Sequence, residues 1–417
     1  MQERIITRES SLSKAGGART LGNTRERFPL LEKSGFVEDE NYKITKKLRW
    51  ERLRIARQLL PGQRVSKCHW LPISSLITIW KNQDAAAAHF RNVFTCGSVW
   101  HCPVCAAKIT NLRRKELQQA INRAKLKGWG YYFITYTIGH KDYHSSKVVL
   151  TKIQEATRKL RSGRFWMDFK ARYGYQGSII PLEVTFSLEN GTHAHKHEIL
   201  FTDHKLSDME ISDLTTSLED RYLDMVAKVG GYATRENGIK VLPGNDDGAG
   251  FVADYIAKFG YDPKVTKIDG LVWEATSWHT KGKANQIDHF TAFQLLDLAV
   301  EGDKWAEEMF LEYARTFKGR KQLTWSPGLR DKLGVIEKEL SDEEAAQLTD
   351  QEASIYAAMG YDEFKKVRHE PLEVLEAARL VDLGTFKIFM LRRFDAVVGS
   401  VDEIIYGPRS PGLFSSE

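Results

Sequence analysis

The chain has 417 residues, 42% of them hydrophobic and 28% charged, and its formal net charge is +6 at pH 7. This composition is typical of a globular protein with two or three domains, and the longest apolar runs have the length of a strand, which argues against a membrane-spanning segment. The first residues are polar and basic rather than apolar, so we expect no secretion signal, no membrane partner and a cytoplasmic location.

Basic residues are concentrated in the first third of the chain. Residues 1–40 are rich in Arg, Ser, Gly and Thr without apolar periodicity, and we predict that they are disordered. Two basic helices are predicted next, one beginning near residue 43 and one over residues 109–126. Each could be an ordinary solvated surface, but two basic helices that flank a cysteine cluster favour contacts with DNA phosphates. The residues of the second helix that we expect to bind DNA are Arg113, Arg114 and Lys115.

All four cysteines lie in one short window, and the last two form the sequence Cys-Pro-Val-Cys. A Cys-x-x-Cys pair with two further cysteines is typical of a tetrahedral zinc site, whereas a disulfide framework is not expected in the cytoplasm. The alternatives are four buried free thiols, or a site in which His69 or His101 replaces one thiolate. The predicted module spans residues 41–128 and includes short strands around residues 74–80. The predicted ligands of its structural Zn²⁺ are Cys68, Cys96, Cys102 and Cys105.

A run of aromatic and β-branched residues at 129–138 predicts a central strand, with Thr135 and Thr137 on one of its faces. Apolar residues at helical spacing follow at 146–172, and residues 185–201 predict a β-hairpin around Asn190-Gly191. This order of strand, helix and two strands predicts an α+β fold with a central antiparallel sheet backed by helices.

The second strand of this hairpin carries histidines at alternate positions, His193, His195 and His197. Because side chains on a strand alternate between faces, all three project from the same face of the sheet. A histidine-rich strand can simply face solvent. Adjacent members of this row are nevertheless close enough to share a metal ion.

The register of the hairpin decides which carboxylate lies beside the histidines. Compared with a strict two-residue turn at Asn190-Gly191, one extra residue in the turn would pair Thr185 with His197 and Ser187 with His195. It would also bring Glu183 diagonally next to His197. We predict this register. A set formed by His195, His197 and Glu183 suits Mg²⁺ or Mn²⁺ with open coordination positions better than it suits a closed zinc site.

A further helix is predicted over residues 251–259, and it carries Tyr255 at the border of its apolar stripe. A tyrosine in such a position ordinarily packs against the core with its hydroxyl at the surface. The alternative is a phenol that attacks a phosphodiester, which requires a metal ion or a cation to stabilise charge on the phosphate. Lys258, on the same side of the helix, is the candidate cation.

The C-terminal part is predicted to be helical. A capping box at Thr291 and Gln294 predicts the start of one helix, and the next has an apolar stripe at Trp305, Met309, Tyr313 and Phe317. The predicted division of the chain is a disordered N-terminus (1–40), a zinc module (41–128), a sheet domain (129–285), a helical extension (286–335) and an acidic helical segment (336–417).

Three motifs, in this order along the chain, resemble those of the replication initiators of small rolling-circle plasmids, which belong to the His-hydrophobic-His (HUH) endonucleases. Residues 133–137 (Phe-Ile-Thr-Tyr-Thr) resemble the first motif of the family, and residues 193–197 (His-Ala-His-Lys-His) resemble its metal-binding motif. Residues 255–258 (Tyr-Ile-Ala-Lys) resemble its nucleophile motif. The resemblance extends over about residues 45–335.

The resemblance implies that the sheet domain is an HUH nuclease that nicks the double-strand origin of a plasmid. It implies that Tyr255 becomes joined to the 5′ phosphate with help from Lys258. It also implies that His195 and His197 hold a divalent ion, with Glu183 as the third ligand. The implied partners are origin DNA, as a single-stranded or hairpin nick site with flanking duplex, and a host helicase. Transposases and conjugative relaxases share this chemistry.

The chain departs from the family at Lys196, where the family has an apolar residue, and this lysine would have to extend to the surface or pair with Glu198. Some relatives carry their tyrosine where this chain has Phe259, so the residue used for a second cleavage stays open. Two other classes of function also stay open. One is a zinc-stabilised nucleic-acid-binding protein without nuclease activity, and the other is a hydrolase that uses a metal-bound water.

Overall fold

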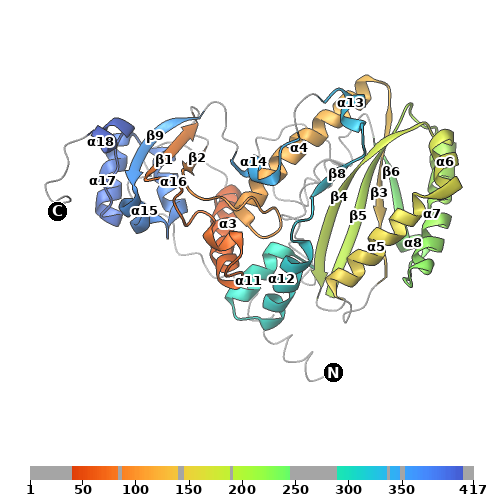
Figure 1. Ribbon diagram of the computed structural model, residues 1–417, viewed down its shortest axis with the longest axis horizontal. Coiled ribbons are helices and arrows are strands. Elements are labelled where there is room, and N and C mark those ends of the chain that lie inside the picture. The colour runs from red at the N-terminus through yellow and green to blue at the C-terminus, as the bar shows by residue number, and fades with distance from the viewer. Residues whose placement is uncertain are drawn as a thin grey trace, which may run out of the picture. The chain divides into compact units, whose positions relative to one another are not determined.

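The computed structural model describes residues 40–82, 87–139, 145–187, 191–244, 289–335, 339–347 and 353–406. The described residues form two compact units (Figure 1). The large unit lies within Asp39–Ser74 and Asn92–Gln351, and the small unit within Ser75–Arg91 and Glu352–Glu417. The predicted disorder of residues 1–40 and the predicted helix over 251–259 concern segments outside the described residues, apart from Glu40.

The large unit is built on an antiparallel sheet with strand order β6-β3-β5-β4-β7, and β8 pairs with β4. The predicted central strand, β3, lies between β5 and β6, and β4 and β5 form the predicted hairpin. The prediction of an α+β fold with a central antiparallel sheet is therefore confirmed. The strands are β3 (Gly130–Tyr136), β4 (Tyr175–Ser187), β5 (Gly191–Thr202), β6 (Ile239–Pro243), β7 (His289–Thr291) and β8 (Leu323–Trp325).

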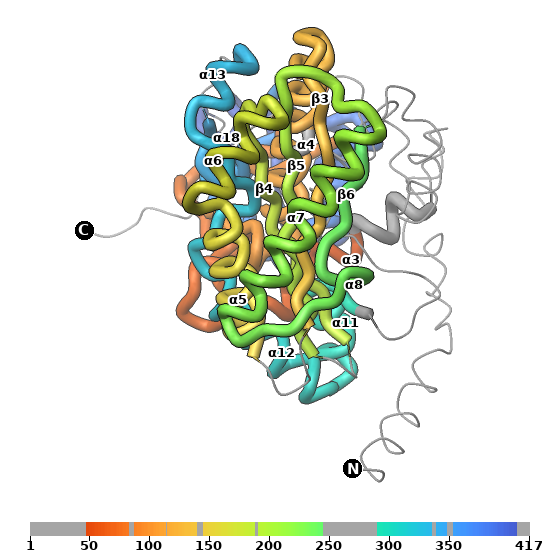
Figure 2. The backbone as a smooth tube through the Cα atoms, turned by 90° about the vertical axis from the view of Figure 1, so that its right-hand side faces the viewer, coloured from red at the N-terminus to blue at the C-terminus, as the bar shows by residue number. Residues whose placement is uncertain are grey.

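Three helices, α5, α6 and α7, cover one face of this sheet (Figure 2). The helical spacing predicted over residues 146–172 is divided between α5 and α6, because Gly163 at their junction adopts a φ of +70°, a conformation that interrupts a helix. A capping box between Ser207 and Glu210 starts α7. The bounds are α5 (Ser146–Leu160), α6 (Gly163–Arg172) and α7 (Asp208–Lys228).

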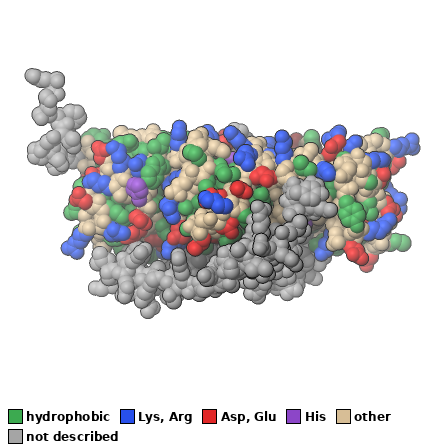
Figure 3. Space-filling model, turned by 90° about the horizontal axis from the view of Figure 1, so that it is seen from below, with side chains coloured by type: hydrophobic (Ala, Val, Ile, Leu, Met, Phe, Trp, Pro, Cys, Tyr) green, Lys and Arg blue, Asp and Glu red, His purple; other side chains and the backbone are tan. Residues whose placement is uncertain are grey.

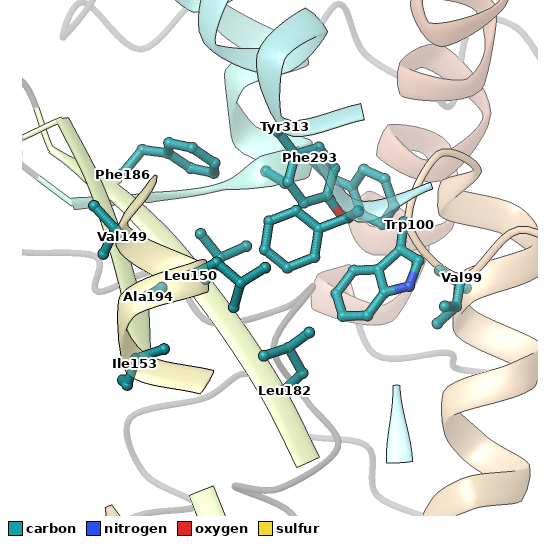
Figure 4. Close-up of a cluster of buried hydrophobic side chains, with 14 of the residues drawn as sticks. Val99, Trp100, Val149, Leu150, Ile153, Leu182, Phe186, Ala194, Phe293 and Tyr313 are labelled. Atoms are coloured by element: carbon teal, nitrogen blue, oxygen red, sulfur yellow. The ribbon is translucent and has the colours of Figure 1, made fainter. Parts of the chain in front are cut away.

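The main core lies on this face of the sheet (Figure 4). Leu150 and Ile153 of α5 pack with Phe186 of β4, and Phe293 and Tyr313 extend the cluster from α11 (Ala292–Val300) and α12 (Lys304–Phe317). The predicted capping box at the start of α11 is confirmed by reciprocal hydrogen bonds between Thr291 and Gln294. The predicted stripe of α12 is also buried, because Tyr313 and Phe317 are fully inaccessible and Trp305 and Met309 pack against the cluster.

The opposite face of the sheet is covered over part of its area by α4 (Pro103–Leu126) and α13 (Leu329–Leu333). Leu117 and Ile121 of α4 pack there with Phe133 and Ile199, which are odd-numbered residues of β3 and β5. The histidines also occupy odd-numbered positions of β5. They therefore continue the row on which α4 packs, beyond the apolar cluster.

The first predicted basic helix is α3, which buries Leu53 and Ala56. Arg52 of α3 forms a bidentate ion pair with Asp297 of α11, at 2.8 and 2.5 Å. Among the described helices, none has both the length and the apolarity needed to cross a bilayer. The remaining helices of the large unit are α3 (Glu40–Leu59), the 3-10 helix η2 (Arg64–Lys67), α8 (Arg235–Gly238) and α14 (Asp342–Gln347).

The small unit combines a hairpin from the first quarter of the chain with the C-terminal segment. Its sheet has strand order β2-β1-β9, all antiparallel, and Ile77 and Ile79 of β1 are fully buried. Its elements are β1 (Leu76–Asn82), β2 (Ala88–Arg91), β9 (Ala353–Gly360), α15 (Tyr361–Val367), α16 (Pro371–Leu380), α17 (Leu383–Phe394) and α18 (Val401–Tyr406).

This arrangement differs from the predicted division of the chain. The predicted division places the strands around residues 74–80 in the zinc module and residues 336–417 in one acidic helical segment. In the structure β1 pairs with β9, and α14 belongs to the large unit. The reason is physical: alternating apolar residues identify a strand, but they carry no information about which distant strand completes its sheet.

Candidate functional site

The β4–β5 hairpin places Glu183 opposite His195 and Thr185 opposite His193. The predicted pairs, Thr185 with His197 and Ser187 with His195, are therefore wrong. The last pair before the turn is Ser187 with Gly191, which leaves residues 188–190 as the connection, and Gly191 has a φ of +66°. Glycine permits this conformation. The position numbers of paired residues sum to 378 here and to 382 in the predicted register, so the turn is centred two residues earlier in the chain than predicted. The shift is even in number, so every side chain stays on its predicted face.

Glu183 and His197 are in direct contact on this face, as the sequence predicted. The Oε2 atom of Glu183 lies 2.6 Å from Nε2 of His197, and the two residues are only 6% and 3% exposed. The ring of His197 also stacks on Phe133, with ring centroids 5.0 Å apart. A carboxylate and an imidazole nitrogen are thus held side by side at the edge of the apolar cluster under α4.

Hydroxyl groups from β3 and the residue that follows it contact the other nitrogen of each ring. Thr135 Oγ1 lies 3.0 Å from Nδ1 of His197, and Thr137 Oγ1 lies 3.4 Å from Nδ1 of His195. The prediction that both threonines share one face is confirmed. The rings of His195 and His197 are nearly parallel, at an interplanar angle of 19°, and that of His193 follows with its centroid 4.3 Å from the ring of His195.

The donors on this face have the chemistry that a divalent ion requires. Glu183 and His197 are already close enough to bind one ion together, and His195 lies beside them with its ring centroid 5.8 Å from that of His197. Among the described residues, the potential metal ligands whose atoms already converge are the four cysteines and not these three residues. The metal-binding role of Glu183, His195 and His197 therefore stays a prediction.

That converged group consists of the four cysteines, whose Sγ atoms all lie within 4.8 Å of one another. Cys68 is 3.7 Å from Cys102 and 3.5 Å from Cys105, and Cys96 is 3.7 Å from Cys105. A tetrahedral zinc site with Zn–S bonds of about 2.3 Å separates its sulfur atoms by about 3.8 Å. The four buried cysteines are thus positioned to bind a metal ion, and their spacing fits zinc.

Local structure supports the sulfur cluster. Cys102 caps the N-terminus of α4 and accepts a hydrogen bond from the backbone N–H of Cys105, while Cys68 accepts one from the N–H of Cys96, both at 3.3 Å. The alternative ligand His101 is engaged elsewhere, because its Nε2 lies 2.8 Å from the carbonyl oxygen of Ala314. Burial raises the pKa of the Cys102 thiol, so a bound cation is what would stabilise the thiolate there.

The chain is similar to a protein named Protein rep. That protein is from Streptomyces lividans, and the identity is 26% over 292 residues, which cover 58% of this chain and 64% of the relative. A second relative, named Neomycin resistance protein, from Streptomyces cyanogenus, is 25% identical over 170 residues, which cover 34% of this chain and 39% of that protein. The chain therefore spans less than two thirds of the length of either relative. No protein-family model matches it.

Arg113 does not lie where a DNA contact requires it, so that prediction is corrected. Its side chain is 6% exposed, and its guanidinium forms ion pairs with Glu116 and with Asp342 of α14, both at 3.1 Å. The apolar periodicity of α4 turns Arg113 toward α14 instead of solvent. The acidic residue Asp342 is therefore part of the large unit, a role that its sequence neighbourhood did not reveal.

The other predicted DNA-binding residues have different positions. Lys115 is exposed on α4, whereas the side chain of Arg114 lies outside the described part of the structure. Lys and Arg side chains are interspersed with Asp and Glu over the described surface in Figure 3. The predicted nucleophile Tyr255 and its neighbour Lys258 also lie outside the described residues, so their roles stay predictions.

A buried charged cluster lies on the face of β5 that points away from the histidines. The carboxylate of Glu198 is fully buried, forms an ion pair with Arg161, and accepts hydrogen bonds from Ser178 and from the hydroxyl of Tyr136, the latter at 2.8 Å. Lys196 was predicted to reach the surface or pair with Glu198. Instead its ammonium donates a hydrogen bond to Oγ1 of Thr157 at 2.6 Å, and Arg161 holds the glutamate.

Replacing Lys196 with methionine is expected to raise the free energy of unfolding at neutral pH by about 1–3 kcal/mol, because a buried ammonium is exchanged for an apolar side chain of similar length. Burial and the nearby charge of Arg161 lower the pKa of Lys196 to about 8, from 10.5. Below pH 8 the amine is charged in both states and the folded protein bears the full penalty. Between pH 8 and 10.5 the folded state alone releases the proton, so the wild type regains stability.

The advantage of Lys196→Met should therefore shrink as the pH rises through this window. Urea unfolding of both proteins, at pH values below and above the window, measures the difference directly. A gain that is constant across the window would contradict the explanation by a buried amine.

Proposed function

We propose that the protein initiates rolling-circle replication of a plasmid by nicking and rejoining DNA at the double-strand origin. The observation that carries the proposal is the 2.6 Å contact between His197 and Glu183, with His195 beside it, on one face of the central hairpin. The similarity to Protein rep over 58% of the chain supports the same assignment.

The proposed reaction has Tyr255 as nucleophile. Its phenolic oxygen attacks the scissile phosphorus, the bond from phosphorus to the 3′ oxygen breaks, and the products are a 5′-phosphotyrosine ester and a free 3′ hydroxyl that primes synthesis. Attack by a 3′ hydroxyl on this ester reverses the step without ATP, because the ester retains the energy of the original phosphodiester. Since a phenol has a pKa of about 10, Tyr255 needs help to react at neutral pH, and we assign that help to Lys258.

The residues proposed to hold Mg²⁺ or Mn²⁺ are His195, His197 and Glu183. A divalent ion bound there would polarise the scissile phosphate and offset the charge that develops on its oxygens. Two imidazoles and one carboxylate leave coordination positions open for phosphate oxygens and water. We also propose that the sheet of the large unit and its helices have the fold of the HUH nucleases.

The cysteine cluster has a separate, structural part in the proposal. Zn²⁺ bound by Cys68, Cys96, Cys102 and Cys105 would fix the start of α4 and keep its exposed Lys115 available to DNA phosphates. The proposed partners are plasmid origin DNA, as a single-stranded or hairpin nick site with flanking duplex, and a host helicase. The proposed place of action is the cytoplasm.

A covalent-adduct experiment tests the proposal. The full chain is incubated with Mn²⁺ and overlapping single-stranded oligonucleotides that tile the DNA molecule carrying its gene. We expect a protein–DNA adduct that mass spectrometry locates on Tyr255, no adduct with Tyr255→Phe, and a strongly reduced yield with His197→Ala. Tyr232→Phe, which changes a tyrosine that is 69% exposed, is the matched control and should form the adduct normally.

The other outcomes identify the alternatives. Cleavage with turnover but without an adduct would indicate a hydrolase that uses a metal-bound water. Binding without cleavage would indicate a zinc-stabilised nucleic-acid-binding protein. Either result overturns the tyrosine mechanism.

A further inference from the structure

We infer that Thr135 and Thr137 are positioning residues. Their hydroxyl groups hold Nδ1 of His197 and of His195, and they thereby direct the Nε2 atoms of both rings toward Glu183. The inference rests on the proposed function, because it concerns how the proposed metal ligands are oriented. It assigns a role to the threonines of the first motif, residues 133–137.

The strand register brings each hydroxyl to its histidine. In the antiparallel β3–β5 ladder Thr135 is paired directly with His197. Moving two residues forward along β3 corresponds to moving two residues back along β5. Thr137 consequently meets His195. The two contacts, at 3.0 and 3.4 Å, repeat one geometry at consecutive positions of the same sheet face.

The direction of the rings follows from the order of the strands. Strand β5 lies between β3 and β4. When Nδ1 of an imidazole faces β3, its Nε2 faces away from β3 and toward β4, where Glu183 lies. His197 has this orientation, with its Nε2 at 2.6 Å from Glu183. In His195 the contact with Thr137 likewise holds Nδ1 on the β3 side, and the same geometry directs its Nε2 toward β4.

The hydroxyls also suit the chemistry of a ligated histidine. A histidine that binds a metal through Nε2 carries its proton on Nδ1 and needs an acceptor there, and a threonine oxygen supplies one. Phe133, stacked on His197, limits rotation of that ring from another side. Valine has nearly the shape of threonine but offers no acceptor, so a Thr→Val substitution removes the hydrogen bond and little else.

Calorimetric titration of the full chain with Mn²⁺ tests the inference without requiring nuclease activity. We expect Thr135→Val and Thr137→Val each to weaken Mn²⁺ binding by about 10- to 100-fold, the usual effect of removing a partner of a ligating histidine. Thr135→Ser and Thr137→Ser keep the hydroxyl and should retain most of the affinity. Thr185→Val is the matched control, because Thr185 lies on the same sheet face opposite His193, and it should bind as the wild type does.

A second measurement covers the case in which a valine variant fails to fold. Nuclear magnetic resonance of the wild type with ¹⁵N-labelled histidine and Mg²⁺ should show His195 and His197 ligated through Nε2 and protonated on Nδ1. Ligation through Nδ1, or folded valine variants with unchanged affinity, would overturn the inference and leave the proposed function standing. The proposed metal site itself fails if the wild type binds no Mn²⁺, or if its Mn²⁺ binding persists in His197→Ala. The inference then fails with it.

Discussion

Replacing Cys105 with serine is expected to abolish zinc binding and to destabilise the large unit strongly. The sulfur atom of Cys105 lies 3.5 Å from Cys68 and 3.7 Å from Cys96, so its loss removes one corner of the four-sulfur cluster. Structural zinc contributes on the order of 10 kcal/mol of binding free energy, which is available to folding only when the complete ligand set is present.

Two measurements check this prediction. The zinc content of the purified protein should fall from one ion per chain to none, and thermal unfolding of the wild type should become much easier after treatment with a chelator. His101→Gln is the control, because the ring of His101 contacts Ala314 and not the sulfur cluster, and it should retain zinc. A full complement of zinc in Cys105→Ser would contradict the assignment of the ligands.

Replacing Arg161 with methionine is expected to lower the free energy of unfolding by about 3–5 kcal/mol, because it leaves the carboxylate of Glu198 buried without its cation. Burial alone would raise the pKa of Glu198, but Arg161 and the hydrogen bonds from Ser178 and Tyr136 hold this pKa below its ordinary value. The ion pair therefore stabilises the fold above the pKa of an unfolded glutamate, and this contribution is lost as the pH falls through the lower pKa of the folded state.

Chemical denaturation of a set of variants tests this explanation. The double variant Arg161→Met/Glu198→Gln should recover much of the loss, since it removes both charges together. Arg164→Met is the matched control three residues away, because Arg164 is 90% exposed and its pair with Asp168 is a surface pair, worth at most about 1 kcal/mol. Equal losses for Arg161→Met and Arg164→Met would show that burial of the pair has no effect.

The features that depend on strand periodicity were predictable from the sequence. Alternation placed Glu183, His195 and His197 on one face of the hairpin, and it placed Thr135 and Thr137 together on one face of their own strand. Both placements are confirmed. The exact pairs were not predictable, since they depend on where along the chain the turn is centred. An even shift of register leaves every side chain on the same face of the sheet. The contact between Glu183 and His197 was therefore predicted correctly although the predicted pairs were wrong.

The features that depend on distant partners were not predictable. Nothing near Glu198 in the sequence identifies Arg161, which reaches it from the residue that follows α5. Arg113 has the sequence context of a surface cation, yet α14 encloses it with Asp342. The four cysteines are the exception, because their own chemistry limits the possible arrangements to few, and the expected cluster forms.

The origin of the small unit in two separate parts of the chain has a consequence for protein synthesis. Its sheet cannot be completed until the C-terminal segment has been translated, and Lys81 and its hydrogen-bond partner Val381 are 300 residues apart. Through most of synthesis the β1–β2 hairpin lacks its partner strand β9, so Ile77 and Ile79 are not yet buried as they are in the folded protein. Native assembly of the small unit therefore depends on the late synthesis of residues 353–406, which supply β9 and the helices that follow it.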